Sequence, residues 1–221
     1  MYLLSLIIIL SYLVGSIPTS IILGKLFKGI DIRNYGSGNA GGTNVFRVMG
    51  WKYGVFTIIF DAFKGAIAVI VIARLHYGNI PFQNATPFDD FTVVQIIAGL
   101  SAVLGHIWTI FAGFRGGKGI ATALGFLLTL ITTDMLIALA VFFVVVIITK
   151  YISLGSILAS VSVPIILFVR ENIFGVNIQG YNIILPFTMV IVCLILYTHR
   201  KNVKRIFAGT ENQINFFRKK R

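Results

Sequence analysis

The sequence predicts an all-α integral membrane protein with seven transmembrane helices, and three observations support this fold class. Hydrophobic residues make up 57% of the 221 residues and charged residues only 12%. The mean hydropathy of +0.92 lies well above the range of soluble domains. The apolar residues are grouped in long segments, and the basic residues gather in alternate connections between them. At this length the chain is expected to form a single transmembrane domain over residues 1–221.

Seven apolar segments are interpreted as membrane spans. Each is expected to be helical, because in lipid every backbone N–H and C=O group must be hydrogen-bonded within its own segment. The segments are residues 3–24, 54–73, 91–112, 119–133, 135–149, 151–169 and 182–198.

The boundaries of these spans differ in how clearly they are marked. The first segment has no basic start and a long apolar run, so it is interpreted as a span and not as a cleaved signal peptide. The fourth and fifth are short against the roughly 20 residues that a span needs. Only Asp134 and Lys150 carry charge between Gly119 and Val169, and we interpret them as turns between three consecutive spans. Five or six spans is the main alternative.

The distribution of charge predicts the orientation. With the N-terminus outside and the C-terminus in the cytoplasm, every basic residue except Arg74, Arg170 and Lys64 falls on the cytoplasmic side. Cytoplasmic loops of membrane proteins are enriched in Lys and Arg. The net charge of +12 is then explained by basic loops on an anionic inner leaflet, and no nucleic-acid partner is expected.

Three short stretches rich in glycine or in cations interrupt the apolar sequence, and all three face the cytoplasm in this orientation. Glycines expose backbone N–H groups, Ser, Thr and Asn add neutral donors, and Arg and Lys add positive charge. This combination suits the binding of phosphate at a membrane surface. The stretches are residues 36–47, 113–119 and 199–205.

The first stretch has more hydrogen-bond donors than a linker needs. It is expected to turn into a helix that starts at Thr43, so that several amides face one anion. A flexible connector is the alternative, since Gly and Asn are ordinary loop residues. The candidate residues are Ser37, Gly38, Asn39, Gly41, Thr43, Asn44 and Arg47.

The second stretch directly precedes the fourth apolar segment. Lys118 and the neighbouring amides of Gly116 and Gly117 are therefore expected at the positive end of that helix. The stretch is not a nucleotide-binding loop, because Gly119 stands where Ser or Thr would hold magnesium and the glycine spacing is one residue short. The alternative is a basic anchor, including Arg115, with small residues for helix packing.

The third stretch and the spans add further candidates. His199 and Asn202 lie three residues apart on one helical face, where ligand binding competes with a simple basic anchor for the last span. Asp61 and Lys64 are also three apart and are expected to pair or to serve the site, since a lone charge in lipid is costly. His106 is expected to be a core hydrogen-bonding residue or part of the pocket.

These motifs resemble the bacterial acyl-phosphate:glycerol-3-phosphate acyltransferase family, PlsY, over nearly the whole chain. The first motif is Gly-Ser-Gly-Asn-x-Gly-x-Thr-Asn-Val-x-Arg, and the third is His-x-x-Asn-Val-x-Arg with Gly-Thr-Glu. The second is Gly-His followed by Phe-x-x-Phe-Arg-Gly-Gly-Lys-Gly-Ile-Ala-Thr, and Asp-Ala-Phe-Lys-Gly lies between the first two. The chain departs from the family pattern at Thr109, where proline is common, and at Arg115, where lysine is common.

The resemblance implies a seven-span enzyme of the bacterial cytoplasmic (inner) membrane with its motif loops on the cytoplasmic side. The implied reaction moves an acyl group from acyl phosphate to the 1-hydroxyl of glycerol 3-phosphate. It gives lysophosphatidic acid and inorganic phosphate, the first step of phospholipid synthesis. The lipid bilayer is the expected surrounding. Metal-ligand clusters and nucleotide motifs are missing from the sequence, so we expect no cofactor and no metal requirement.

The resemblance also implies roles for individual residues. The catalytic group is His199, Asn202, Lys118 and Arg47. The proton acceptor stays open between His199 and the substrate's own phosphate. The substrate- and phosphate-binding residues are Ser37, Gly38, Asn39, Gly41, Thr43, Asn44, Arg115, Gly116, Gly117 and Glu211, with Asp61, Lys64 and His106 in support.

The competing class is a membrane transporter of phosphate or an organic phosphate. Such a protein is expected to carry its ionisable residues near the midplane of discontinuous, repeated helices, whereas here they gather at one surface. A non-catalytic lipid-binding scaffold would explain the basic loops but not the Ser, Thr and Asn pattern. The His-x4-Asp dyad of acyl-CoA-dependent acyltransferases is missing, which suits a different acyl donor.

Overall fold

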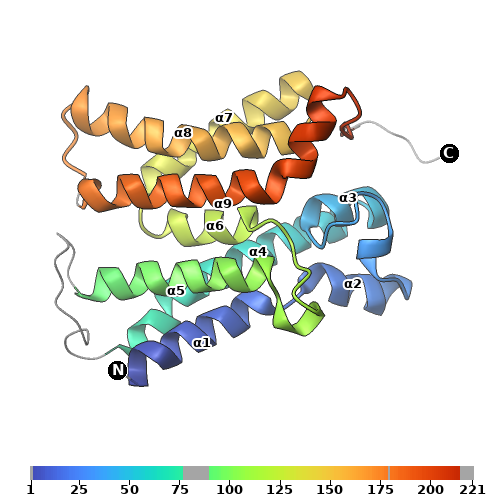
Figure 1. Ribbon diagram of the computed structural model, residues 1–221, viewed down its shortest axis with the longest axis horizontal. Coiled ribbons are helices and arrows are strands. Elements are labelled where there is room, and N and C mark those ends of the chain that lie inside the picture. Colours follow the sequence, from blue (N-terminus) through green and yellow to red (C-terminus); the bar gives the residue numbers. More distant parts are fainter. Residues whose placement is uncertain (1, 77–89, 179, 215–221) are drawn as a thin grey trace. The chain divides into compact units, whose positions relative to one another are not determined.

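The computed structural model describes residues 2–76, 90–178 and 180–214, and the chain is helical over these ranges, with no strand (Figure 1). The α-helices are α1 (Tyr2–Ser16), α2 (Thr19–Lys28), α3 (Gly42–Met49), α4 (Trp51–Ile70), α5 (Asp90–Ile107), α6 (Ile120–Leu128), α7 (Thr132–Thr149), α8 (Ile152–Asn172) and α9 (Tyr181–Phe207). Three short 3-10 turns are η1 (Ile32–Asn34), η2 (Ile72–Leu75) and η3 (Ile110–Ala112). The basic tail Arg218–Arg221, which contributed to the predicted orientation, lies outside the described residues.

Six segments of the described chain are long and apolar enough to cross a membrane, and they match six of the seven predicted spans. They are Tyr2–Lys28, Trp51–Leu75, Asp90–Ala112, Thr132–Thr149, Ile152–Asn172 and Tyr181–Phe207.

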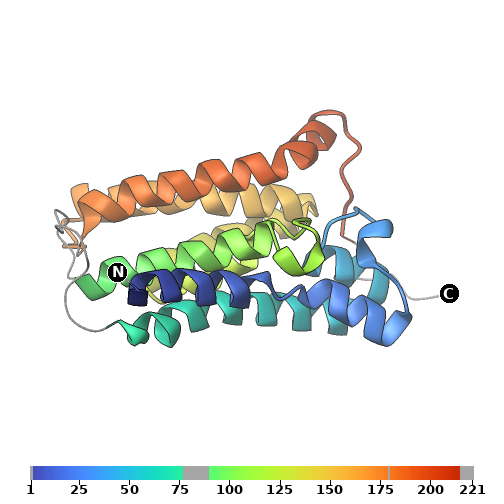
Figure 2. The ribbon, with the colours of Figure 1, turned by 60° about the horizontal axis from the view of Figure 1, so that its bottom comes forward.

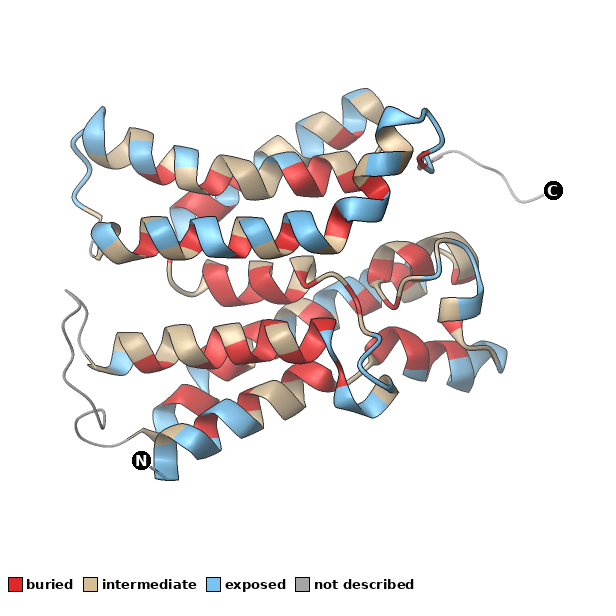
Figure 3. Cartoon of the chain, in the orientation of Figure 1, coloured by how far each residue is buried: buried red, intermediate tan, exposed pale blue. Residues whose placement is uncertain are grey.

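The fourth predicted span is much shorter than its apolar segment. Its helix, α6, has nine residues and is about 14 Å long, against a hydrocarbon core of about 30 Å. It ends at Leu128, where the Thr129 hydroxyl donates to the Phe126 carbonyl at 2.6 Å and competes with the helical pattern. Every residue of α6 is buried or half-buried (Figure 3).

Backbone contacts divide the chain into two compact units, residues 1–132 and 133–221. In the first unit α1 packs along α5, while α4 contacts α3, α5 and α6 (Figure 2). In the second unit α8 packs against α9. The ends of α7 and α8 are joined by an ion pair, in which Arg170 Nη1 lies 2.7 Å from Asp134 Oδ2.

Glycines allow the helices of the first unit to approach closely. A Cβ on Gly15 or Gly105 would overlap the backbone of the opposite helix in the α1–α5 pair. A Cβ on Gly65 or Gly125 would do the same where α4 crosses α6. Small residues at such crossings are the usual means of tight helix packing in membranes.

Two hydrophobic clusters lie in the first unit, and they involve opposite parts of the first span. One contains Ile7 of α1 with residues of α4 and α5, and the other contains Ile21 and Leu23 of α2 with residues of η1 and α3. Between them the first span carries three buried polar residues, Ser16, Thr19 and Ser20. The candidate site begins there.

Candidate active site

A proline divides the first span into two helices. α1 ends at Ser16 and α2 begins at Thr19, because Pro18 has no N–H to continue the helical hydrogen bonds. The break leaves two carbonyl groups that side chains from other elements satisfy. The Thr109 hydroxyl donates to the Ser16 carbonyl, and Lys64 Nζ donates to the Ile17 carbonyl at 2.8 Å.

A buried ion pair lies beside this break. Lys64 Nζ is 2.7 Å from Asp61 Oδ1, with side chains only 2% and 3% exposed, so the predicted pairing is confirmed. The Thr19 hydroxyl donates to the same oxygen at 3.0 Å, and His106 Nδ1 lies 3.8 Å from it. We call these four residues the Asp61 cluster. A buried charge needs several partners of this kind because it has lost its water.

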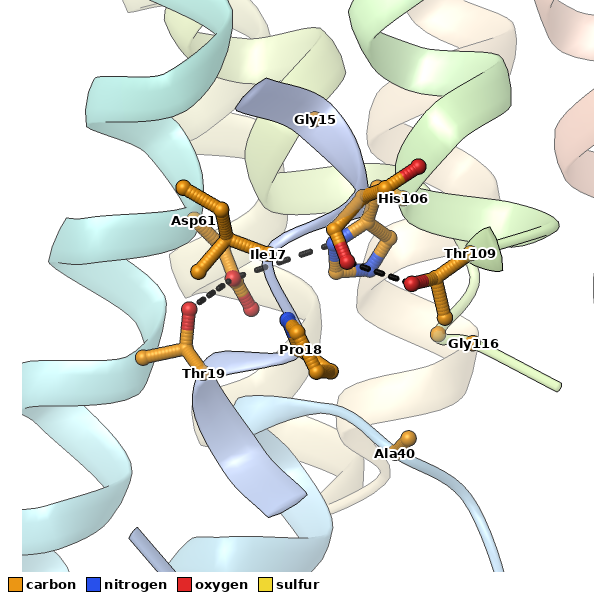
Figure 4. Close-up of a pocket in the computed structure, with 11 residues that line it drawn as sticks. Gly15, Ile17, Pro18, Thr19, Ala40, Asp61, His106, Thr109 and Gly116 are labelled. Atoms are coloured by element: carbon orange, nitrogen blue, oxygen red, sulfur yellow. Dashed lines mark hydrogen bonds and ion pairs between the residues drawn. The ribbon is translucent and has the colours of Figure 1, made fainter. Parts of the chain in front are cut away.

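Three members of the Asp61 cluster, Thr19, Asp61 and His106, line a small pocket within the first unit (Figure 4). Its wall also includes Ala40 from the first glycine-rich stretch and Gly116 and Gly117 from the second. The two stretches therefore reach the same pocket, as expected for loops that serve one site. The remaining lining residues are Gly15, Ser16, Ile17, Pro18 and Thr109.

Asn44 shapes the first stretch from inside. Its amide group donates to the carbonyls of Ile32 and Tyr35, both at 3.0 Å, and its Oδ1 accepts from the backbone N–H of Ser37 at 2.8 Å. The side chain is 1% exposed. Both amide hydrogens of Asn44 are thus used by the loop itself, which indicates a role in loop geometry.

The stretch opens onto α3 as expected, with the helix starting at Gly42, one residue before the predicted Thr43. Gly36 and Gly38 have φ angles of 61° and 72°, a left-handed conformation that favours glycine. Of the other candidates, Gly38 is exposed, and Ser37, Asn39, Gly41, Thr43 and Arg47 are half-buried.

The second stretch folds back onto the end of α5. The N–H groups of Gly116 and Gly117 donate to the carbonyls of Ile107 and His106, each at 3.0 Å. These two amides therefore hold the loop closed. Lys118 is half-buried two residues before α6 begins, as predicted, and Arg115 is exposed.

Arg33, which precedes the first stretch, contacts the backbone just before the second. Its Nη1 donates to the Ala112 carbonyl at 2.7 Å, and its Nη2 lies 2.7 Å from Asp31 Oδ2. The hydrogen bond from Arg33 lowers the pKa of Asp31, and the same bond raises the pKa of Arg33. Both side chains stay charged at neutral pH. The Arg33 guanidinium holds the backbone immediately before the second stretch in position.

In the second unit, Glu211 is held by three donors. Asn202 Nδ2 and Ser153 Oγ donate to its Oε1 at 2.9 Å and 3.0 Å, and Arg205 Nε donates to its Oε2 at 2.7 Å. Burial alone would raise the pKa of Glu211, but the hydrogen bonds from Arg205, Asn202 and Ser153 outweigh it and lower the pKa. The carboxylate therefore stays ionised and fixes the orientation of Asn202.

His199 lies on the same helix, α9, and is 3% exposed. Its Nδ1 lies 2.9 Å from the Ile195 carbonyl. A carbonyl can only accept, so the neutral ring carries its proton on Nδ1 and its lone pair on Nε2. This tautomer suits a residue that accepts a hydrogen bond or a proton through Nε2.

Known proteins identify the family. A family model described as glycerol-3-phosphate acyltransferase matches residues 5–209. The chain belongs to the glycerol-3-phosphate acyltransferase family. A relative of that name from Chlorobaculum tepidum is 44% identical, covering 96% of this chain and 97% of its own. Another, from Chlorobium phaeobacteroides strain BS1, is 44% identical and covers 98% of each chain.

Two solved structures resemble this family member. Both are of PlsY, described as an integral membrane glycerol 3-phosphate acyltransferase. Its glycerol 3-phosphate form has 35% identity and a TM-score of 0.79, and the match covers 96% of each chain. Its lysophosphatidic acid form has 34% identity and a TM-score of 0.76, covering 96% of this chain and 95% of that one. The expectation of a multi-pass membrane acyltransferase is confirmed.

Within this glycerol-3-phosphate acyltransferase family member, three contact residues were missed by sequence reasoning. Thr19 could have been suspected, because Pro18 in an apolar helix signals a break with unsatisfied carbonyls nearby. Arg33 and Ser153 gave no such signal, since their partners Ala112 and Glu211 lie 79 and 58 residues away in the chain.

Proposed function

We propose that this protein transfers an acyl group from acyl phosphate to the 1-hydroxyl of glycerol 3-phosphate, releasing lysophosphatidic acid and inorganic phosphate. The observation that carries the proposal is the nearly full-length match to PlsY structures described as glycerol 3-phosphate and lysophosphatidic acid forms. In the reaction the new ester C–O bond forms as the acyl–phosphate C–O bond breaks. The hydroxyl proton passes to a base, and phosphate leaves.

Two phosphorylated substrates require several cations and amide donors close together. Arg47, near the end of α3, and Lys118, just before α6, are the proposed cations that stabilise the charge of the phosphate groups during transfer. Ser37 and Thr43 would supply hydroxyl donors. We retain Gly38, Asn39, Gly41, Arg115 and Glu211 as candidates near the phosphates. Asn44, Gly116 and Gly117 act by shaping the loops.

His199 and Asn202 are the proposed polar groups at the reacting hydroxyl. Acyl phosphate has a good leaving group, so positioning and charge stabilisation supply much of the catalysis. The proton goes to His199 Nε2 or to a phosphate oxygen of the substrate. Neither unit carries all the motif residues, and we therefore propose that residues 1–221 act as one acyltransferase domain.

The proposed arrangement in the membrane has seven spans, with the N-terminus outside and the site on the cytoplasmic side of the bacterial inner membrane. The concentration of basic residues on one side supports this orientation. The short α6, the fourth span in chain order, brings the number of crossings to seven. The packing of α6 against α4 and α5 supports a crossing here, because this packing shields the backbone of α6 from lipid.

The direct test is phosphate release by the purified, detergent-solubilised protein. Palmitoyl phosphate is supplied with and without glycerol 3-phosphate, and without metal or nucleotide. We expect release that depends on glycerol 3-phosphate, with an equal amount of lysophosphatidic acid. Lack of turnover with palmitoyl phosphate would contradict the proposed donor, and palmitoyl-CoA and acyl-carrier-protein donors are then compared in the same assay.

A further inference from the structure

The second glycine-rich stretch rests directly on His106. The N–H of Gly117 donates to the His106 carbonyl at 3.0 Å, and a Cβ on Gly117 would overlap the imidazole ring. A Cβ on Gly116 would overlap the carbonyl of His106. Both the backbone and the ring of His106 therefore set the position of the two residues that precede Lys118.

The ring of His106 in turn lies beside Asp61. Its Nδ1 lies 3.8 Å from Asp61 Oδ1, the oxygen to which the Thr19 hydroxyl donates at 3.0 Å (Figure 4). Lys64 Nζ lies 2.7 Å from the same oxygen. Lys64 Nζ also donates a hydrogen bond to the Ile17 carbonyl at the helix break. Contacts thus run without interruption from the break in the first span to the second stretch. In such a dry network each hydrogen bond to a charged group is worth more than one in water.

We propose that Thr19, Asp61 and Lys64 are positioning residues for phosphate binding. They hold the His106 ring, and through it the 113–119 stretch, in the place where Lys118 meets a substrate phosphate. The three residues act through His106 and not on the substrate. This inference rests on the proposed function in one respect, which is that Lys118 binds phosphate.

The chain offers a matched control for the mildest change in this cluster. Thr19 and Thr57 are both buried threonines, 6% and 0% exposed. The Thr19 hydroxyl donates to Asp61, whereas the Thr57 hydroxyl donates to the Tyr53 carbonyl of its own helix at 2.8 Å. Valine keeps the shape of threonine and removes the hydroxyl. Thr19→Val and Thr57→Val therefore make the same chemical change, with and without the Asp61 contact.

The first measurement is hydrogen–deuterium exchange over residues 113–119 in the full-length, detergent-solubilised protein. We expect exchange about tenfold faster in Thr19→Val than in wild type, because the loop is held less firmly once Asp61 loses a donor. Thr57→Val should match wild type, and Thr19→Ser, which restores a hydroxyl, should exchange at close to the wild-type rate. Equal exchange in Thr19→Val and Thr57→Val would overturn the proposal. This readout needs no activity, so it remains decisive even if the proposed reaction fails.

The second measurement separates positioning from a general loss of stability. In the phosphate-release assay, Thr19→Val should raise the KM for at least one phosphorylated substrate by about tenfold, while kcat changes by less than about twofold. Its thermal midpoint should lie within a few degrees of that of Thr57→Val. If both KM values stay within twofold of wild type, the proposal is wrong.

Discussion

Single residues in the two glycine-rich stretches divide between those that build the loops and those that carry charge. Asn44 uses both amide hydrogens on backbone carbonyls, and Gly116 and Gly117 use their N–H groups on the end of α5. Arg47 supplies positive charge in the last turn of α3, and Lys118 supplies it just before the first turn of α6. The proposed chemistry therefore depends most on these two cations, with the other groups setting where they lie.

Lys118→Ala and Arg47→Ala are each expected to lower kcat/KM for glycerol 3-phosphate by about 100-fold or more, because each removes a charge that faces phosphate in the transition state. Steady-state phosphate release measures this, and the amount of protein in the membrane fraction shows whether insertion is intact. Lys150→Ala is the control, since Lys150 is an exposed residue in the turn between α7 and α8. It should stay within twofold of wild type. Near-normal rates in either site variant would show that its residue is not one of the cations that bind phosphate.

Glu211 predicts a pH dependence of stability. Its folded pKa is below the usual value, so its stabilising effect is complete above the pKa of the unfolded chain, about 4.3 for an ordinary glutamate. The effect is lost as the pH falls through the lower folded value. Thermal melting in detergent between about pH 7 and pH 3 should show a steeper fall for wild type than for Glu211→Gln, which has no such charge to lose. Parallel curves would contradict the role assigned to this carboxylate.

At the level of elements, the crossing of α4 and α6 depends on glycine. In an open helix, Gly→Ala would stabilise by about 1 kcal/mol through helix propensity. At Gly125 a Cβ would overlap the Ala62 carbonyl, so the helices would have to separate. We expect Gly125→Ala to destabilise the protein by about 1–3 kcal/mol, measured by thermal melting. Ala140→Val, which adds bulk at an exposed position of α7, should change little. A higher melting temperature in Gly125→Ala would show that the crossing can accommodate the added methyl group without separation of the helices.

For the whole molecule, the number of crossings depends on α6. If α6 crosses, Thr133 and Lys150 lie on opposite sides of the membrane, with Thr133 outside. If it does not cross and the N-terminus is outside, their positions are exchanged. Both residues are exposed, and the native Cys193 can be changed to serine. We expect a membrane-impermeant maleimide to label Thr133→Cys in intact cells, and Lys150→Cys only after the membrane is opened. The reverse pattern would favour six spans.

The sequence predicted the parts of this molecule that follow from local spacing. The spacing of Asp61 and Lys64 places them on adjacent turns of one helix, and they pair. Glycine followed by Thr43 indicated a helix start, and α3 begins one residue earlier. What local spacing could not show is which partner a polar group finds across helices. Thr19 donates to Asp61 from 42 residues away, and Asn44 looked like a ligand-binding residue until its backbone partners were known. The length of α6 could not be predicted either, because the apolar segment continues past Thr129 and hydropathy alone does not show that the helix ends there.

The proline break in the first span has a consequence for how the chain is made. The carbonyls of Ser16 and Ile17 receive their side-chain donors from Thr109 and Lys64, which are synthesised much later. Until then the Ser16 carbonyl needs water or the insertion machinery, while the Ile17 carbonyl has only the backbone N–H of Thr19 as a donor. The N-terminal span therefore reaches its final state only after the third span has left the ribosome. Truncated nascent chains that end before Thr109 should stay associated with the translocon.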